Sequence, residues 1–136
     1  MKKEMVLAAD VERMDEVLDF VNEVLESCDA PMKTIMQIDI AVEEIFVNIA
    51  HYAYQPGTGE ACISIDVQEA PACAVIRFAD SGKPYNPLER EDPDVSLGVE
   101  EREIGGLGIY MVKKSMDEVS YAYENGQNVL TIRKLL

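Results

Sequence analysis

Apolar side chains recur at helical spacing in the first part of the chain. Between residues 11 and 27 they fall three or four positions apart, which predicts an amphipathic helix with Asp10 as its N-cap. A second apolar stripe over Pro31–Tyr54 predicts another helix, because proline is accepted in a first turn. The turn residues at 55–59 end that pattern.

Strand patterns fill much of the remainder. Residues 62–67 alternate with a period of two, and residues 72–78 are mostly apolar and β-branched, which predicts a hairpin. Near the end of the chain, Glu124–Gln127 contains an Asn-Gly pair of the kind favoured in tight hairpin turns. The predicted strands are residues 3–9, 62–67, 72–78, 118–123 and 129–134.

Between Asp80 and Glu103 the chain carries charges, prolines and glycines without a regular pattern. A loop of roughly 20 residues inside one domain usually has a function of its own. A last helix is predicted from Gly105 to about Met116. The order of elements predicts an α+β fold, a two-layer sandwich in which helices cover one face of a mixed, mainly antiparallel sheet, formed by a single domain of residues 1–136.

Charge and cysteine content narrow the partners and the location. Lys and Arg total 12 against 26 for Asp and Glu, and the formal charge of −14 disfavours binding to nucleic acid or to an anionic membrane. No apolar run approaches the ~20 residues that cross a membrane, and the N-terminus lacks the apolar core of a secretion signal. Cys28, Cys62 and Cys73 are scattered and are interpreted as small buried residues in a reducing compartment, so a cytoplasmic location is predicted.

Glu44 and Asn48 are the first candidate functional pair. They are four residues apart, so they share one face of the second predicted helix, beside its apolar stripe. An amide oxygen can bind Mg²⁺, and a carboxylate can take a proton from a hydroxyl group. The alternative is a pair of solvated polar residues on an amphipathic helix.

The segment Asp80-Ser81-Gly82-Lys83-Pro84 follows directly after a predicted buried strand. Its carboxylate can accept a hydrogen bond from an exocyclic amine such as that of adenine, and Gly82 would let a ligand ring approach the backbone closely. Asp, Ser, Gly and Pro also form ordinary turns, so the alternative is a strand-ending turn.

Gly105-Gly106-Leu107-Gly108 opens the last predicted helix. Glycines at a helix N-terminus expose N–H donors where the helix dipole favours an anion, so this segment is a candidate phosphate site. It lacks the sequence of a Walker A loop and the spacing of a Rossmann fingerprint. The alternative is a hinge or a place of close helix packing.

The three segments follow one another as the N, G1 and G2 boxes do in the GHKL ATPase superfamily, which includes histidine kinases and gyrase. Nearly the whole chain resembles the anti-sigma-factor serine/threonine kinases of that superfamily, and Ala41–Tyr54 is similar to their N box. The resemblance implies ATP and Mg²⁺ as cofactors and a STAS-type anti-sigma-factor antagonist as protein substrate. It also implies a sigma factor as second partner and a homodimer.

Residue by residue, the resemblance implies that Glu44 is the general base toward a serine hydroxyl and that Asn48 binds Mg²⁺. Asp80 would receive the adenine amine, Gly82 would lie beneath the ring, and residues 85–104 would form a lid over ATP. The residues implied to bind the nucleotide are Asn48, Asp80, Gly82, Pro84, Gly105, Gly106, Leu107 and Gly108.

The chain departs from the superfamily pattern in two places. Pro84 stands where many members have the last glycine of Asp-x-Gly-x-Gly, and the predicted lid is rich in acidic residues. One alternative is therefore a nucleotide-binding module that sequesters a partner without phosphotransfer, and another is a fragment of an ATPase or histidine kinase. His51, the only histidine, lies inside the N-box helix and is interpreted as a structural residue or as one that supports a site residue, not as a phosphoacceptor.

Overall fold

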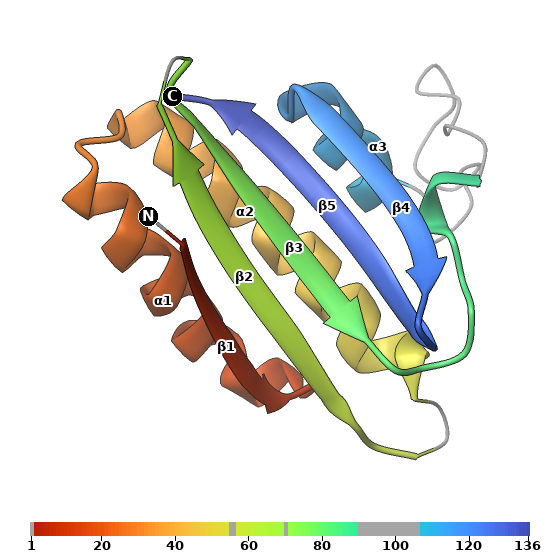
Figure 1. Ribbon diagram of the computed structural model, residues 1–136. Coiled ribbons are helices and arrows are strands. Elements are labelled where there is room, and N and C mark those ends of the chain that lie inside the picture. Colours follow the sequence, from red (N-terminus) through yellow and green to blue (C-terminus); the bar gives the residue numbers. More distant parts are fainter. Residues whose placement is uncertain (1, 55–56, 70, 90–106) are drawn as a thin grey trace.

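The computed structural model describes residues 2–54, 57–69, 71–89 and 107–136 (Figure 1). Short turns of 3-10 helix at Val11–Arg13 and Pro87–Glu89 and a turn of π-helix at Ile49–Ala53 connect the longer elements. These longer elements are β1 (Lys2–Ala8), α1 (Met14–Ser27), α2 (Met32–Asn48), β2 (Glu60–Gln68), β3 (Cys73–Asp80), α3 (Leu107–Ser115), β4 (Glu118–Glu124) and β5 (Gln127–Leu135).

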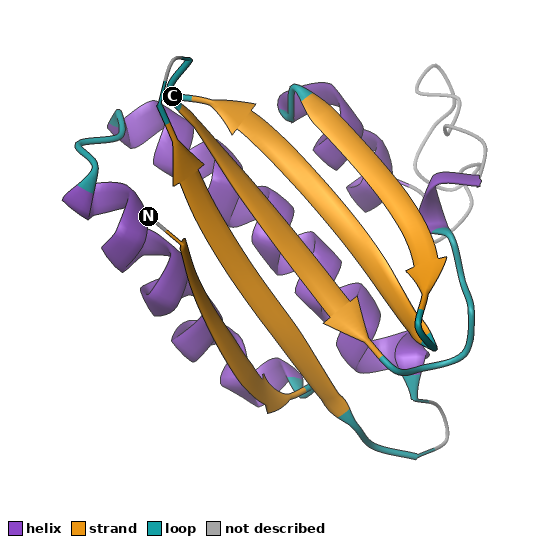
Figure 2. Cartoon of the chain, viewed as in Figure 1, coloured by secondary structure: helices purple, strands orange, loops and turns teal. Residues whose placement is uncertain are grey.

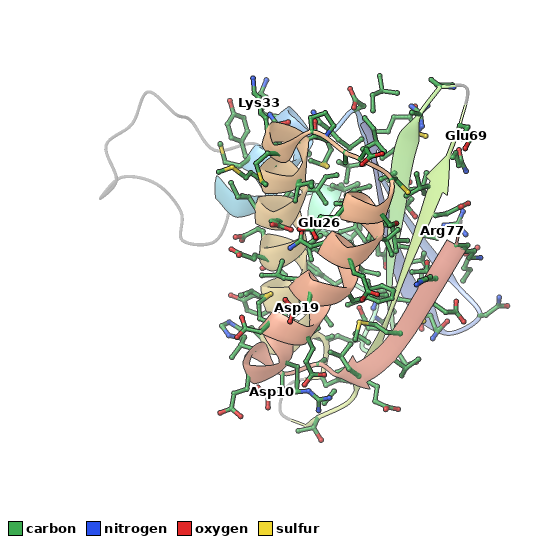
Figure 3. The ribbon with its side chains drawn as sticks, turned by 90° about the vertical axis from the view of Figure 1, so that its left-hand side faces the viewer. Asp10, Asp19, Glu26, Lys33, Glu69 and Arg77 are labelled. Carbon is green, nitrogen blue, oxygen red and sulfur yellow. The ribbon has the colours of Figure 1, made fainter. Side chains whose placement is uncertain are left out.

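The strands form a five-stranded sheet in the order β1-β2-β3-β5-β4. Each of the four strand pairings within the described residues is antiparallel, so the predicted two-layer α+β architecture is confirmed with a sheet that is antiparallel throughout. Helices α1, α2 and α3 cover one face of this sheet (Figure 2). Viewed from the side, Arg77 of β3 projects from the opposite face (Figure 3).

Alternation along the strands places the core between sheet and helices. Buried residues alternate along β2 and β5, and α2 buries a stripe three or four residues apart, as the apolar periodicity predicted. The largest side chains with almost no exposed surface are Phe46, Phe78, Leu25, Ile38, Ile45, Ile63, Ile65, Ile76 and Ile132.

The end of α2 departs from the predicted helix over Pro31–Tyr54. The α-helix ends at Asn48 and continues as the wider π-helical turn Ile49–Ala53. The last carbonyls of a helix have no partner within it, and here the Ala53 carbonyl accepts a hydrogen bond from the Lys83 N–H at 3.2 Å. The C-terminal end of the N-box helix is therefore joined to the segment that follows β3.

Tyr54 fixes the same corner from the other side. Its hydroxyl donates to the Glu60 carbonyl at 2.5 Å and accepts from the Ser81 N–H at 2.8 Å. The ring lies so close to Gly59 that a Cβ at that position would be 2.4 Å from the ring carbons. The start of β2 and the end of β3 are thus held together next to the helix end.

The turn between β4 and β5 and the three cysteines were also predicted from the sequence. The two-residue hairpin turn is confirmed, with Asn125 and Gly126 at φ values of 53° and 75°. The three cysteines are free, and only Cys73 is buried. Cys28 is partly exposed because it lies at the end of α1, and Cys62 is partly exposed because it lies on the uncovered face of the sheet. The interpretation of all three as buried was therefore wrong. None of the described helices is long and apolar enough to cross a membrane. The predicted lid beyond residue 89 lies outside the described residues.

Candidate functional site

A cavity of about 330 Å³ opens where the C-terminal half of α2 meets the ends of β3 and β5. Mostly apolar walls with a few converging polar groups are typical of sites for small molecules. The cavity brings together Asn48 and Asp80, which are far apart in the sequence. The lining residues are Ile45, Ile49, Ala53, Phe78, Pro87, Ile109 and Leu130, the polar Asn48, Asp80, Lys83 and Asn128, and the tyrosines Tyr52, Tyr85 and Tyr121.

Asp80 ends β3 and is 5% exposed. Its Oδ1 accepts two hydrogen bonds, from the Gly82 N–H and from Asn128 Nδ2, each at 3.0 Å. Among the described residues, none donates to Oδ2. An ionised carboxylate accepts hydrogen bonds through both oxygens, so Oδ2 remains available to a donor on a ligand, such as the exocyclic amine of adenine.

Asn128 of β5 is 7% exposed and is the cross-strand partner of Asp80. Besides Asp80, its Nδ2 donates to the Lys83 carbonyl at 2.9 Å. Its Oδ1 accepts from the Tyr85 N–H at 3.0 Å and from the Tyr121 hydroxyl. Partial burial raises the pKa of Tyr121, and the Asp80 carboxylate acts in the same direction, so the phenol stays protonated and donates at neutral pH.

Asn128 and Tyr121 lie outside the three candidate segments predicted from the sequence. One signal was present in the sequence. Asn128 has the same strand parity as Leu130 and Ile132, both of which face the core, so a polar residue stands at an inward position. Buried polar side chains of this kind need partners, and partners at the end of a sheet often belong to a site.

Gly82 is required by its contact with the end of the N-box helix. A Cβ at this position would lie 2.2 Å from the Ala53 carbonyl oxygen and 2.6 Å from the carbonyl carbon. Both atoms belong to backbone that is held by the hydrogen bond from Lys83, so they cannot move aside freely. Contact of Gly82 with a ligand ring stays a prediction, since Gly82 does not line the cavity.

Gly82→Ala is expected to lower the free energy of unfolding by about 1–3 kcal/mol, because the added methyl group forces the β3–α2 junction apart. Urea denaturation would measure the change. Gly57→Ala is the matched control: its Cβ would lie 3.3 Å from the Tyr54 carbonyl oxygen, a tight but tolerable contact. Equal stabilities of the two variants would contradict the assignment of Gly82 to this junction.

Glu44 lies against the first turn of α3. A Cβ on Gly108 would be 1.9 Å from Glu44 Oε1 and 2.0 Å from its Cδ, so only glycine leaves room for the carboxylate here. Free N–H groups and the dipole at a helix N-terminus favour a negative charge. Glu44 is partly exposed and borders the cavity without lining it, whereas Asn48, one turn further along α2, does line it.

The other residues singled out in the sequence lie around this cavity only in part. Pro84 is exposed and lines a neighbouring groove with Tyr85 and Tyr121, and its contact with nucleotide stays a prediction. Leu107 begins α3, and Gly105 and Gly106 lie outside the described residues. His51 is exposed on the π-helical turn, where its ring meets Tyr52 edge-on.

A divalent cation at Asn48 would need oxygen ligands from elsewhere. The part of the chain that the structure describes contains no group of three or more His, Cys, Asp or Glu residues that could hold a metal. Mg²⁺ commonly takes one or two protein ligands and completes its shell with phosphate oxygens and water. The Asn48 amide oxygen could thus serve as one ligand of a cation whose other ligands are phosphate oxygens and water.

Sequence comparisons identify the family of the chain. The sequence profile of the family described as "Histidine kinase-like ATPase domain" matches residues 7–134. The chain is 32% identical over 100 residues to the serine-protein kinase RsbW of Bacillus thuringiensis, covering 71% of this chain and 61% of that protein. It is 25% identical over 95 residues to the serine/threonine-protein kinase BtrW of Bordetella bronchiseptica, covering 70% and 66% respectively. The matches thus span less than two thirds of either relative.

A structural comparison supports the fold alone. A chain in the crystal structure of the SiaB–SiaC complex from Pseudomonas aeruginosa superposes with a TM-score of 0.61 at 17% sequence identity. The superposition covers 97% of this chain and 89% of that chain. Nearly every described element therefore has a counterpart in a solved structure.

Proposed function

Because the chain belongs to the histidine kinase-like ATPase domain family, we propose that it binds Mg²⁺–ATP and phosphorylates a serine or threonine of a STAS-type anti-sigma-factor antagonist. The observation that carries nucleotide binding is the buried Asp80, whose Oδ2 receives no donor from the described residues in a cavity with mostly apolar walls. Similarity to proteins named serine kinases supports the reaction class. Sequestration of a sigma factor, a homodimer and a cytoplasmic location complete the proposal.

Different residues of the cavity would contact different parts of the nucleotide. Asp80 would accept the adenine amine while Ile49, Phe78 and Leu130 provide apolar walls. The Asn48 amide oxygen would hold the cation, and the N–H groups at the start of α3 would donate hydrogen bonds to phosphate oxygens. Bound ATP would supply the phosphoryl group, and Mg²⁺ would supply positive charge that offsets the negative charge of the phosphate oxygens.

Glu44 is the proposed general base. Its carboxylate would take the proton from the hydroxyl of the protein substrate as that oxygen bonds to the γ-phosphorus of ATP. The bond between this phosphorus and the β–γ bridging oxygen would break, and ADP would be the leaving group. Its position at the border of the cavity suits this role, because the hydroxyl must arrive from outside while the nucleotide fills the interior. The chain would contribute mainly by positioning the two reactants.

A stripe of exposed apolar residues on α2 leads to Glu44. Met32, Met36 and Ile40 are 66%, 57% and 59% exposed and stand four residues apart, and Glu44 is the next position in that spacing. Lys33, which follows Met32 in the sequence, lies at the start of α2 (Figure 3). We assign this stripe to the antagonist protein, which would place apolar side chains on the methionines and present its hydroxyl to Glu44, with an acidic group facing Lys33.

Met36→Glu is expected to lower phosphorylation of the antagonist by about tenfold, because a charge replaces an apolar contact at the centre of the stripe. The affinity for ATP should remain within twofold, since Met36 does not line the cavity. Initial rates at limiting antagonist and calorimetry with ATP would measure the two quantities. The control is Val11→Glu, which changes another exposed apolar side chain outside α2. Equal rates of antagonist phosphorylation for the two variants would contradict a role of the stripe in substrate binding.

Transfer of labelled γ-phosphate from ATP to the purified antagonist tests the function directly. We expect an acid-stable phosphoserine or phosphothreonine product. The second candidate is a nucleotide-binding module that sequesters its partner, favoured by Pro84 and by the acidic residues between 85 and 104. ATP binding without transfer would select this module, and the absence of any nucleotide binding would overturn both candidates.

A further inference from the structure

We propose that Asn128 sets the base selectivity of the cavity by fixing the orientation of the Asp80 carboxylate, an inference that rests on the nucleotide binding proposed above. The two residues are direct cross-strand partners at the ends of β3 and β5. Asn128 belongs to none of the three segments that the sequence singled out. It would act as a positioning residue, through Asp80, and would not contact the reacting atoms.

The orientation of the Asn128 amide is determined by its partners. Nδ2 has two hydrogens, and acceptors stand at Asp80 Oδ1 and at the Lys83 carbonyl, 3.0 and 2.9 Å away. Oδ1 has two lone pairs and receives the Tyr85 N–H at 3.0 Å and the Tyr121 hydroxyl. A flipped amide would place donors against donors and acceptors against acceptors, so only one orientation satisfies all four bonds.

This fixed amide in turn orients Asp80. Two donors, Asn128 Nδ2 and the Gly82 N–H, converge on Oδ1, so the carboxylate cannot rotate without breaking both bonds. Oδ2 then presents an acceptor to the ligand in one fixed direction. An adenine amine satisfies that acceptor, whereas the C6 carbonyl of hypoxanthine or guanine opposes it with a second acceptor.

The same amide also fixes part of the cavity wall. Lys83 and Tyr85 both line the cavity, and both are held to Asn128 through their backbone. Loss of the amide would therefore disturb recognition of the base and leave Asn48, which lies on α2, with its own helical support. Selectivity between bases should change more than binding of the phosphates.

The test compares ATP with inosine triphosphate (ITP), which carries a carbonyl in place of the 6-amino group. Asn128→Asp keeps the shape and the acceptor for Tyr85 and Tyr121 but removes the donor to Asp80 and to the Lys83 carbonyl. We expect ATP affinity to fall by about tenfold and the ratio of ATP to ITP affinity to fall by at least about fivefold, as one donor to a buried carboxylate is lost. Isothermal titration calorimetry with each nucleotide gives both numbers.

Two further variants separate this effect from charge and from misfolding. Gln127→Glu adds the same charge to β5 one residue earlier, where the side chain faces the other side of the strand, and should keep the wild-type ratio. Asn128→Ser is neutral, and its side chain is too short to reach Asp80, so it should lower the ratio of ATP to ITP affinity. It therefore tests the proposal even if the two adjacent carboxylates of Asn128→Asp destabilise the fold. Thermal unfolding would establish that each variant is folded.

The possible outcomes are distinct. A lower ATP-to-ITP ratio in the folded Asn128 variants, with an unchanged ratio in Gln127→Glu, supports the assignment. Equal loss of both nucleotides, or no loss, would overturn it, because a merely structural role predicts no change of ratio. Failure of the wild-type protein to bind either nucleotide would overturn the proposed function itself.

Discussion

Asp80→Asn is expected to lower the affinity for ATP by about 100-fold, which corresponds to about 2.8 kcal/mol. Hydrogen bonds to a charged group contribute about 1.5–3 kcal/mol, and here the acceptor would be replaced by a donor. In the wild-type protein the Gly82 N–H and Asn128 Nδ2 both donate to Oδ1 of Asp80. Because both require an acceptor, the amide oxygen of the new asparagine would take the place of Oδ1. The new amide nitrogen would then occupy the place of Oδ2 and oppose the adenine amine.

The same substitution should reverse the preference between bases. An amide donor at the place of Oδ2 suits the C6 carbonyl of ITP, so ITP affinity should equal or exceed ATP affinity in Asp80→Asn. Calorimetry with both nucleotides would measure this. Asp66→Asn, which makes the same chemical change on the uncovered face of the sheet, is the control and should behave as wild type. Unchanged ATP binding by folded Asp80→Asn would show that the base is recognised elsewhere.

Glu44→Gln is expected to lower the rate of phosphotransfer by about 10²–10⁴, the usual contribution of a general base. The amide has the shape of the carboxylate and would still pack against Gly108, so the geometry at the start of α3 should persist. The affinity for ATP should stay within about threefold, because Glu44 does not line the cavity. Single-turnover transfer to the antagonist, at saturating ATP, would isolate the chemical step.

Two variants sharpen the interpretation of Glu44. Glu43→Gln removes the same charge one residue earlier on α2, where the side chain is exposed, and should leave the rate within twofold. Gly108→Ala keeps the carboxylate but forces it away from α3, since the new Cβ would lie 1.9 Å from Oε1. It should therefore lower the rate without removing any proton acceptor. Undiminished transfer by Glu44→Gln would remove Glu44 from the role of base.

The elements could be predicted from the sequence because they depend on local periodicity. The spacing of Glu44 and Asn48 within α2, the alternation along β5 and the Asn125–Gly126 turn all follow from contacts within a few residues. The same local rules failed at the end of α2. The π-helical turn Ile49–Ala53 places the Ala53 carbonyl next to Gly82, and that contact depends on the segment after β3, which is distant in the sequence.

By itself, the sequence predicted most of the helices and strands and named candidate side chains for nucleotide binding. Only the tertiary structure decided which of these meet. It placed Asn48 and Asp80 in one cavity, put Glu44 at its border against Gly108, and set Asn128 opposite Asp80. These relations follow from strand order, register and helix packing, which join residues far apart in the chain and leave no periodic trace in it.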